Sequence, residues 1–314
     1  MFVSLTLFAL ACTGTPADSG AGDTADTGDT AEVIDTTPVW TQYRIESSST
    51  LSGIYASGSG VYVVGSDGFA WEGGSDGWSF MDIDVDDADL TDLWGEGKND
   101  DAVLAASTSL GTVAQYTGTG GWTTGTMGDT SELKAIGGSS VDSLFAVGWG
   151  KAWSYDGAAW TYEELPDQSA RLNDVYGDGD EAFAVGEGGE CMRRKAGVWA
   201  GCRTDVAVAL NAVDGSGPDD VWAVGEQGTV IHWDGSAWEL KEVPTTETLW
   251  AVLVPEVGVV IAVGSNGMAL RYTDGTWERL YTGVDNALYA IHGVSRSNLW
   301  ASGNRGMVLQ FKEE

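Results

Sequence analysis

Along most of the chain, apolar and polar residues alternate with a period of two, and turn residues interrupt the alternation every few positions. The segment Leu210 to Trp238 shows this most clearly. It contains the runs "LNAV", "VWAVG" and "TVIHW" and the start of "SAWELKEV", separated by "DGSGPDD", "EQG" and "DG". Such alternation, bounded by Gly, Asp and Ser, is typical of short antiparallel strands joined by hairpins. We predict four strands in this unit and almost no helix in the chain, because no long segment keeps a 3.6-residue period.

The same unit recurs about every 40 residues, which is the sign of a repeat fold. One series of tryptophans marks it: Trp40, Trp78, Trp122, Trp160, Trp199, Trp238 and Trp277. A series of leucines follows the tryptophans by 11 or 12 residues each time: Leu51, Leu90, Leu133, Leu172, Leu210, Leu249 and Leu288. Four antiparallel strands at this period are typical of a β-propeller blade.

The two ends of the repeat region complete each other. The last unit begins at Leu288 and ends after Phe311, before a fourth strand and its tryptophan. The first unit is preceded by a lone strand, "VWTQYRIESSST", which contains Trp40. We therefore predict an all-β, seven-bladed β-propeller over residues 39–314, in which the N-terminal strand completes the C-terminal blade and leaves no free sheet edge. The second blade is the irregular one, because "DDAVLAASTSLG" lacks the Ala-Val-Gly signature.

The second strand of each unit carries a repeated signature, as in "DDVWAVG" and "SNLWASG". Its bulky residue should pack between neighbouring blades, and the series is Tyr62, Phe145, Phe183, Trp222, Ile261 and Trp300. The glycines that follow, such as Gly228, Gly267 and Gly306, suit turns with positive φ. Because these residues recur in nearly every unit, we interpret them as structural.

The blade pattern "LxAVxGS…DDVWAVGxxGxIxxxDGxxW" resembles the bacterial propellers related to photosystem II assembly factors and to Asp-box (sialidase-type) repeat proteins. The likeness covers roughly residues 39–314. It departs from a true Asp-box, because Asp and Gly adjoin here, as in Asp234-Gly235. The signatures of WD-repeat and kelch blades are absent. The resemblance implies the propeller fold but no single function, since propellers carry many unrelated activities.

The first 12 residues, "MFVSLTLFALAC", are an apolar run too short to span a bilayer as a permanent helix. They resemble a bacterial lipoprotein signal with Cys12 as the cleavage and lipidation point, although no Lys or Arg precedes the run. Residues 13–38 hold six acidic and no basic residues, which is typical of a disordered tether. We expect an exported lipoprotein of the outer membrane or cell surface. Ordinary export to the periplasm or medium, and a buried N-terminal strand, are the alternatives.

Two further cysteines fall in one predicted blade. Cys191 and Cys202 flank the hairpin between its third and fourth strands, at positions equivalent to Val230 and Lys241 in the next unit. Facing positions across a hairpin can hold a disulfide, and export favours its formation. We predict that the two are bonded; the alternative is a pair of reduced thiols that the repeat tolerates.

The formal net charge is −32, and −26 of it remains on residues 39–314. This argues against nucleic acid or anionic lipid as a partner, and it suits cationic partners or solubility. In the densest acidic run, "MDIDVDDADLTD", Asp82, Asp84 and Asp86 alternate and should share one face of an outer strand. That face is either a cation site or, in our preferred interpretation, a solvated edge that discourages strand pairing.

Motifs of catalysis are scarce. There is no phosphate-binding Gly-Lys-Ser/Thr, no nucleophile elbow and no metal-ligand spacing, and we predict no cofactor. His232 and His292 lie in different units, and we expect neither to meet a Ser and an Asp in a triad. A sialidase-like glycan hydrolase is the enzymatic alternative that the resemblance implies. Such an enzyme gathers three arginines on one face, where only Arg171 and Arg305 fall here.

We therefore expect a binding or scaffolding module rather than an enzyme. The turns between second and third strands hold short polar residues that differ from unit to unit, between glycines that hardly vary. Variable residues on a constant frame are typical of a recognition surface. The candidates are Asp67, Glu187, Glu226, Gln227, Asn266, Asn304 and Arg305. The expected partner of this monomer is an envelope protein or a surface ligand, and a structural surface protein that binds copies of itself is the remaining alternative.

Overall fold

The computed structural model describes residues 40–45, 47–58, 60–85, 88–97, 103–118, 121–127 and 132–313. All of them belong to the unit Thr37–Glu314. The predicted signal, with Cys12 at its end, and the predicted tether of residues 13–38 lie outside the described residues. Among the helices of the described part, none has the length and apolar character needed to cross a membrane.

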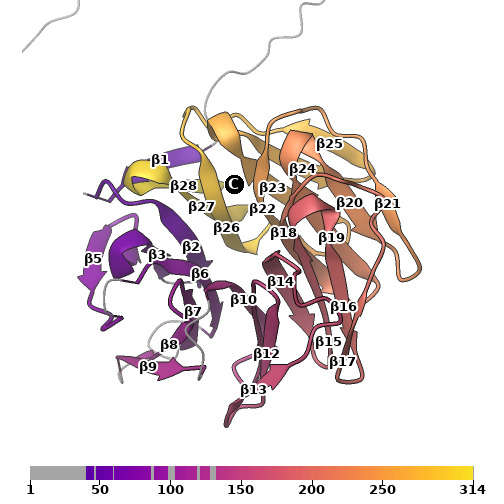
Figure 1. Ribbon diagram of the computed structural model, residues 1–314. Coiled ribbons are helices and arrows are strands. Elements are labelled where there is room, and N and C mark those ends of the chain that lie inside the picture. Colours follow the sequence, from indigo (N-terminus) through magenta and orange to yellow (C-terminus); the bar gives the residue numbers. More distant parts are fainter. Residues whose placement is uncertain are drawn as a thin grey trace, which may run out of the picture. The chain divides into compact units, whose positions relative to one another are not determined.

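Seven four-stranded antiparallel sheets form the blades, which we number from the one that begins at Leu51 (Figure 1). Blade one consists of β2 (Leu51–Ala56), β3 (Val61–Gly65), β4 (Ala70–Gly74) and β5 (Gly77–Met81). Blade two consists of β6 (Leu90–Glu96), β7 (Val103–Thr108), β8 (Thr112–Thr117) and β9 (Trp122–Thr126). Blade three consists of β10 (Leu133–Ser140), β11 (Ser143–Gly148), β12 (Lys151–Tyr155) and β13 (Trp160–Glu163).

The second half of the ring repeats this plan. Blade four consists of β14 (Leu172–Asp178), β15 (Glu181–Gly186), β16 (Cys191–Lys195) and β17 (Val198–Gly201). Blade five consists of β18 (Leu210–Gly217), β19 (Asp220–Gly225), β20 (Val230–Trp233) and β21 (Trp238–Leu240). Blade six consists of β22 (Leu249–Glu256), β23 (Val259–Gly264), β24 (Ala269–Thr273) and β25 (Thr276–Arg279). Blade seven consists of β26 (Leu288–Ser295), β27 (Asn298–Gly303), β28 (Met307–Lys312) and β1 (Trp40–Arg44).

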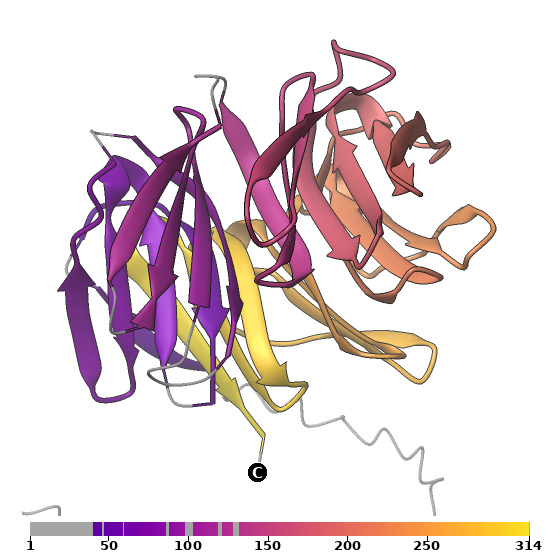
Figure 2. The same ribbon diagram turned by 90° about the horizontal axis from the view of Figure 1, so that it is seen from below.

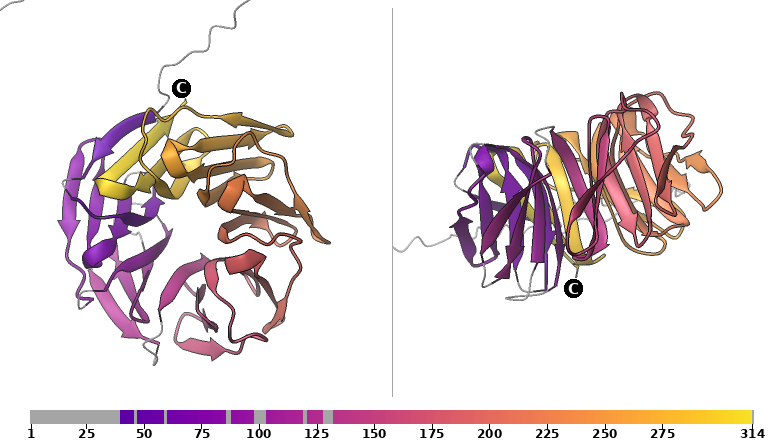
Figure 3. Two further views of the ribbon diagram at one scale, coloured as in Figure 1. Left: turned by 45° about the horizontal axis from the view of Figure 1, so that its top comes forward. Right: turned by 60° about the horizontal axis from the view of Figure 1, so that its bottom comes forward.

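The ring closes as the sequence predicts. Strand β1 pairs antiparallel with β28, and Trp40 lies opposite Phe311 in the register. In the turned views, β1 lies against the yellow C-terminal strands (Figure 2, Figure 3). The first strand of each blade contacts the first strand of the next blade around the whole ring, including β26 against β2. The prediction of seven blades with mixed-chain closure is therefore confirmed.

The repeated residues form the core between blades. All seven leucines of the leucine series are at most 1% exposed. Trp222 of blade five packs against Tyr272 and Trp277 of blade six, with ring centroids 5.2 and 6.1 Å away. Burying such rings contributes on the order of 2–3 kcal/mol each. The predicted role of the bulky second-strand residues, as wedges between blades, is confirmed at this position.

The turns between second and third strands require glycine. At Gly267, φ is +64°, and a Cβ atom would lie 1.9 Å from the carbonyl oxygen of Val284. The glycine amide also donates to the carbonyl of Asn286 at 2.8 Å. A side chain at this position is excluded both by the backbone conformation and by the neighbouring connection.

The cysteine pair lies where the hairpin geometry predicts. Cys191 and Cys202 are at disulfide distance, with Cα atoms 5.1 Å apart. The amide of Cys202 donates to the carbonyl of Cys191 at 2.9 Å, which extends the pairing of β16 and β17 by one residue.

The acidic run after β5 differs from the prediction. Strand β5 ends at Met81, and Asp82 and Asp84 lie in the connection to blade two rather than on an outer strand. Their alternation persists because Ile83 and Val85 between them are buried, at 5% and 8% exposure. Asp86 lies outside the described residues.

Candidate functional site: a recess at the mouth of the central channel

The first strand of every blade carries an irregularity directly after its leucine. The pairing register skips one residue there, for example between Leu210 and Ala212 and between Leu249 and Ala251. An extra residue of this kind is a β-bulge, which redirects a side chain away from the regular ladder. The seven bulged residues are Ser52, Thr91, Lys134, Asn173, Asn211, Trp250 and Tyr289. All seven line one cavity of about 190 Å³, which we call the channel recess.

Three of the bulged residues join neighbouring blades. Asn173 donates from Nδ2 to the carbonyl oxygen of Leu210 at 3.0 Å, and Asn211 donates in the same way to Leu249 at 2.9 Å. The hydroxyl of Ser52 donates to the carbonyl of Leu90. Each bond connects one blade to the next, so these residues have a structural role at the recess wall.

Lys134, Trp250 and Tyr289 make no such bond to the next blade among the described residues. The indole Nε1 of Trp250 donates to Ser265 Oγ at 3.0 Å, and its ring lies 5.6 Å from that of Tyr289. These two rings come from blades six and seven and form an aromatic side of the recess.

The opposite part of the ring is cationic. Lys134 Nζ lies 5.5 Å from the ring centroid of Trp149, and the guanidinium of Arg171 lies 5.0 Å from it. Trp149 is 49% exposed, so its indole remains accessible between the two cations. Lys134 is paired with Glu132 at 2.6 Å, while Arg171 has no ion-pair partner among the described residues. Of Lys134, Trp149 and Arg171, only Lys134 lines the channel recess. The recess can therefore receive an aromatic or apolar group against Trp250 and Tyr289, and acceptor oxygens near Lys134.

Further along the same strands, three carboxylates hold neighbouring blades together: those of Asp92, Asp174 and Asp214. Asp92 accepts hydrogen bonds from Leu93 N at 2.8 Å and from Ile136 N of the next blade at 3.0 Å. Asp174 accepts from Val175 N at 2.7 Å and from Val213 N of the next blade at 2.8 Å. Burial raises the pKa of Asp92 to about 6, although the backbone donors act in the opposite direction.

Burial and the negative charge of Asp92 raise the pKa of Asp174 well above its usual range. Asp214 accepts from Val254 N at 2.7 Å, and burial raises its pKa to about 7. His292 accepts at Nδ1 from Ala56 N at 3.1 Å, and burial lowers its pKa to about 4. The imidazole is therefore neutral and joins blade seven to blade one. These perturbed groups belong to inter-blade contacts.

The predicted turn residues are accessible but lie outside the recess. Asp67, Gln227, Asn266 and Arg305 occupy left-handed positions, with φ between 55° and 64°. None of the seven predicted residues lines the channel recess. Glu187 and Asp67 instead line two separate grooves on different blades.

Contacts with the connections between blades account for two of the predicted residues. Asn266 donates to Glu247 Oε2 at 2.9 Å, and Asn304 Oδ1 accepts from Asn286 at 2.6 Å. Glu226 and Gln227 are exposed at the tip of their turn. The structure does not bring the seven residues together into one site, and their role in binding stays a prediction.

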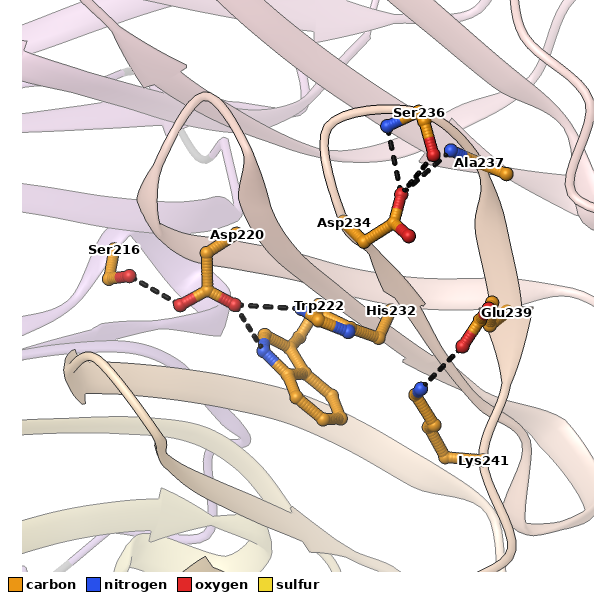
Figure 4. Close-up of polar contacts among 9 residues, drawn as sticks. All are labelled: Ser216, Asp220, Trp222, His232, Asp234, Ser236, Ala237, Glu239 and Lys241. Atoms are coloured by element: carbon orange, nitrogen blue, oxygen red, sulfur yellow. Dashed lines mark hydrogen bonds and ion pairs between the residues drawn. The ribbon is translucent and has the colours of Figure 1, made fainter. Parts of the chain in front are cut away.

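His232 corrects one expectation, because it does meet an aspartate and, through it, a serine (Figure 4). His232 Nε2 lies 2.8 Å from Asp220 Oδ1, and the other carboxylate oxygen accepts from Ser216. Burial alone would raise the pKa of Asp220, but hydrogen bonds from Ser216, His232 and Trp222 outweigh it and lower that pKa. The aspartate stands between the other two, whereas a catalytic triad needs the histidine in the middle.

The same position is polar and paired in other blades. Arg193 of blade four pairs with Glu181 at 2.7 Å, and Gln310 of blade seven contacts Asn298 at 3.4 Å. His232 also stacks on Trp222 at 4.1 Å. This repetition indicates that the pair of His232 and Asp220 supports the blade.

Sequence reasoning missed the bulged residues, although a signal for them exists. The residue after each leucine of the leucine series is Ser, Thr, Lys, Asn, Asn, Trp or Tyr, while the leucine itself never changes. Trp149 was missed because its turn is shorter than the others and lacks a polar tip. Within the described ranges, no group of three or more His, Cys, Asp or Glu could hold a metal ion.

Fold and recess together define a seven-bladed β-propeller with a small polar and aromatic recess at its axis. No family model matches the chain, and no curated protein matches it. Solved structures match at low identity. A catalytically inactive virginiamycin B lyase from Staphylococcus aureus with quinupristin has a TM-score of 0.75 and 12% identity, covering 88% of this chain and 100% of that one.

Two other solved structures match at comparable TM-scores. YCF48 bound to a D1 peptide has a TM-score of 0.71 and 16% identity, covering 88% of this chain and 98% of that one. The WD40 β-propeller domain of Doa1 has a TM-score of 0.72 and 10% identity, covering 86% of this chain and 95% of that one. At these identities the likeness establishes the fold alone.

Proposed function

We propose that this propeller is a binding or scaffolding module that acts without catalysis and recognises a segment of a partner protein at the channel recess. The observation that carries the proposal is the ring of seven bulged residues, which differ in chemistry on an otherwise repeated frame. The repeat fold forms with different residues at this position of each blade. Variable residues placed around one cavity are typical of a site that recognises a ligand or partner.

The size of the recess favours a protein segment over a free small molecule. Pockets for drug-sized ligands measure roughly 300–1,000 Å³, whereas the channel recess measures about 190 Å³. Such a volume suits one or two inserted side chains, with the rest of the partner lying on the face around it. The peptide bound to YCF48 supports this mode, because it shows a similar propeller with a peptide partner.

The residues around the recess match those that dominate protein interfaces. Trp, Tyr and Arg supply most binding energy at such sites, because large rings and planar guanidinium groups bury much area with little loss of freedom. Here Trp250 and Tyr289 belong to the recess lining. Trp149 and Arg171 contact each other next to the lining residue Lys134. We further propose that the module is exported and anchored at Cys12 to the cell envelope, as the signal-like N-terminus and the acidic segment 13–38 support.

Crosslinking and affinity capture from native envelopes test the proposal. The wild-type protein is compared with a recess variant, Trp250→Ala with Tyr289→Ala, and with a turn variant, Glu226→Ala with Gln227→Ala. We expect a partner that the wild type and the turn variant capture and that the recess variant loses by at least about tenfold. Loss with the turn variant alone would place recognition on the turns and contradict the proposal. Conversion of an envelope glycan by the purified protein would contradict its non-catalytic part.

A further inference from the structure

A second recess lies at blade one, and its lining shares no residue with the channel recess. It has a volume of about 360 Å³ and is formed by the turn between β3 and β4, the end of β5 and the following connection. Its lining residues are Asp67, Gly68, Phe69, Phe80, Asp82, Ile83, Asp84 and Val85. We call it the blade-one groove.

Two phenylalanines stand exposed in this groove. Phe69 is 37% exposed and Phe80 is 56% exposed. Together with the buried Trp71 they form an edge-to-face cluster, with ring centroids 5.6 to 6.1 Å apart. This mutual packing holds the two phenyl rings in place while part of each remains in contact with solvent.

The fold does not require aromatic residues at these positions. At the position of Phe69, the other blades carry Thr112, Lys151, Glu190, Thr229, Met268 and Met307. At the position of Phe80, they carry Thr124, Tyr162, Gly201, Leu240, Arg279 and Gln42. Since six blades form without this pair, the exposed phenylalanines of blade one call for an explanation other than folding.

Carboxylates surround the two rings. Asp67, Asp82 and Asp84 are exposed, and within the described part of the chain none of their carboxylate groups makes a hydrogen bond or ion pair. The backbone amide of Asp67 donates to the carboxylate of Asp89 at 2.9 Å. The buried side chains of Ile83 and Val85 fix the alternation that turns Asp82 and Asp84 outward. No Lys or Arg lines the groove. The groove is therefore aromatic at its centre and negative around it.

We propose that the blade-one groove binds a basic segment of a partner protein through its Lys or Arg side chains. A cation over an aromatic face gains electrostatic energy, and nearby carboxylates can pair with the same cation. A second copy of this chain is an unsuitable occupant, because two chains that each carry a net charge of −32 repel each other. This site is separate from the channel recess and does not depend on the proposed function there.

A short capped peptide, acetyl-Gly-Arg-Gly-Arg-Gly-amide, tests the proposal by titration calorimetry at physiological ionic strength. A polyanion attracts any cation, so the decisive variant leaves charge unchanged: Phe69→Ala with Phe80→Ala. We expect saturable binding that weakens about tenfold in this variant. A second variant, Asp82→Asn with Asp84→Asn, should weaken binding to a similar extent.

Control variants change exposed residues on other blades. Tyr162→Ala with Leu240→Ala removes two exposed apolar side chains equivalent to Phe80, and Glu239→Gln with Glu242→Gln removes two charges elsewhere. Both controls, and the recess variant Trp250→Ala with Tyr289→Ala, should bind within about twofold of wild type. Equal binding by the phenylalanine variant and wild type would overturn the proposal, as would equal weakening in the controls. Equally tight binding of a peptide with Leu in place of Arg would show that the groove recognises apolar side chains, and it would contradict the proposal of a basic partner.

Discussion

Two sets of side chains lie on the same inner strands, only one to three positions apart, and have different roles. The bulged residues, such as Trp250 and Tyr289, line the channel recess, and some of them make no bond to the next blade. The buried titratable residues, such as Asp174 and His292, bond to backbone amides of the next blade. The bulge position admits both roles, because Asn173 and Asn211 also bond to the next blade. Bulged residues without such a bond, such as Trp250 and Tyr289, are the ones left to meet a partner.

The outer strands contain a ring-holding contact of the same kind. Glu163 of blade three accepts two hydrogen bonds from Arg194 of blade four at 2.7 Å and one from Trp199 at 2.8 Å. Burial alone would raise the pKa of Glu163, but these donors and Ser154 outweigh it and lower that pKa. Both charged side chains are nearly buried, at 13% and 12% exposure.

The largest effect on stability is expected for Glu163→Ala. The change leaves the buried guanidinium of Arg194 without its carboxylate, which costs about 3–5 kcal/mol of unfolding free energy. Chemical denaturation measures it. The neighbouring exposed Glu164→Ala is the control and should change stability by less than about 0.5 kcal/mol. Similar values for the two variants would contradict the assignment of Glu163 to the ring-holding set.

His292 should make stability depend on pH. Its pKa of about 4 in the folded state lies below the ordinary 6.5, so the folded protein binds fewer protons between these values. The free energy of unfolding keeps the full contribution of the neutral imidazole above about pH 6.5. It loses up to about 3 kcal/mol as pH falls towards 4, because the unfolded chain then binds the proton more readily.

The measurement compares unfolding free energies of wild type and His292→Gln across pH 4 to 8. The glutamine oxygen can still accept from Ala56 N, so the difference between the two proteins isolates the titration of the histidine. We expect the unfolding free energy of the variant to rise relative to that of wild type as pH falls. A constant difference over this range would contradict a buried neutral imidazole.

Asp214 should act with the opposite sign. Its pKa of about 7 lies above the ordinary 3.8, so the folded state favours the protonated form and its stability contribution is lost as pH rises through 7. Asp214→Asn removes the charge and keeps an oxygen for Val254 N. We expect a gain of about 2 kcal/mol at pH 8 and little gain at pH 4, measured by denaturation. Destabilisation at pH 8 would show that the carboxylate is needed.

The smallest stability effect is expected in the recess. Trp250→Ala with Tyr289→Ala removes side chains that are only partly buried and bonded to no neighbouring blade, so unfolding free energy should change by about 1 kcal/mol or less for each. Thermal unfolding checks this. A cooperative loss several times larger would place these rings in the ring-holding set and weaken the case for recognition.

The sequence predicts the ring of blades well because the residues that build it recur at a regular spacing. The leucine series, the wedge residues such as Trp222 and the closure by Trp40 depend on spacing alone. The recess was not predicted, because a β-bulge turns one residue out of the alternation and no simple period of two reveals it. The cluster of Lys134, Trp149 and Arg171 comes from three separate elements and becomes visible only when the blades are adjacent.

The pairing of β1 with β28 also determines when the ring can close during synthesis of the chain. The hydroxyl of Tyr43 donates to Gln310 across a separation of 267 residues, so the strand made first must wait for nearly the whole chain before it finds its neighbour. Until then, β1 has unpaired backbone N–H and C=O groups, and the sheet at the other end of the partly folded chain is incomplete. Completion of synthesis and closure of the ring are therefore coupled, and a chain interrupted before β28 has no partner for β1.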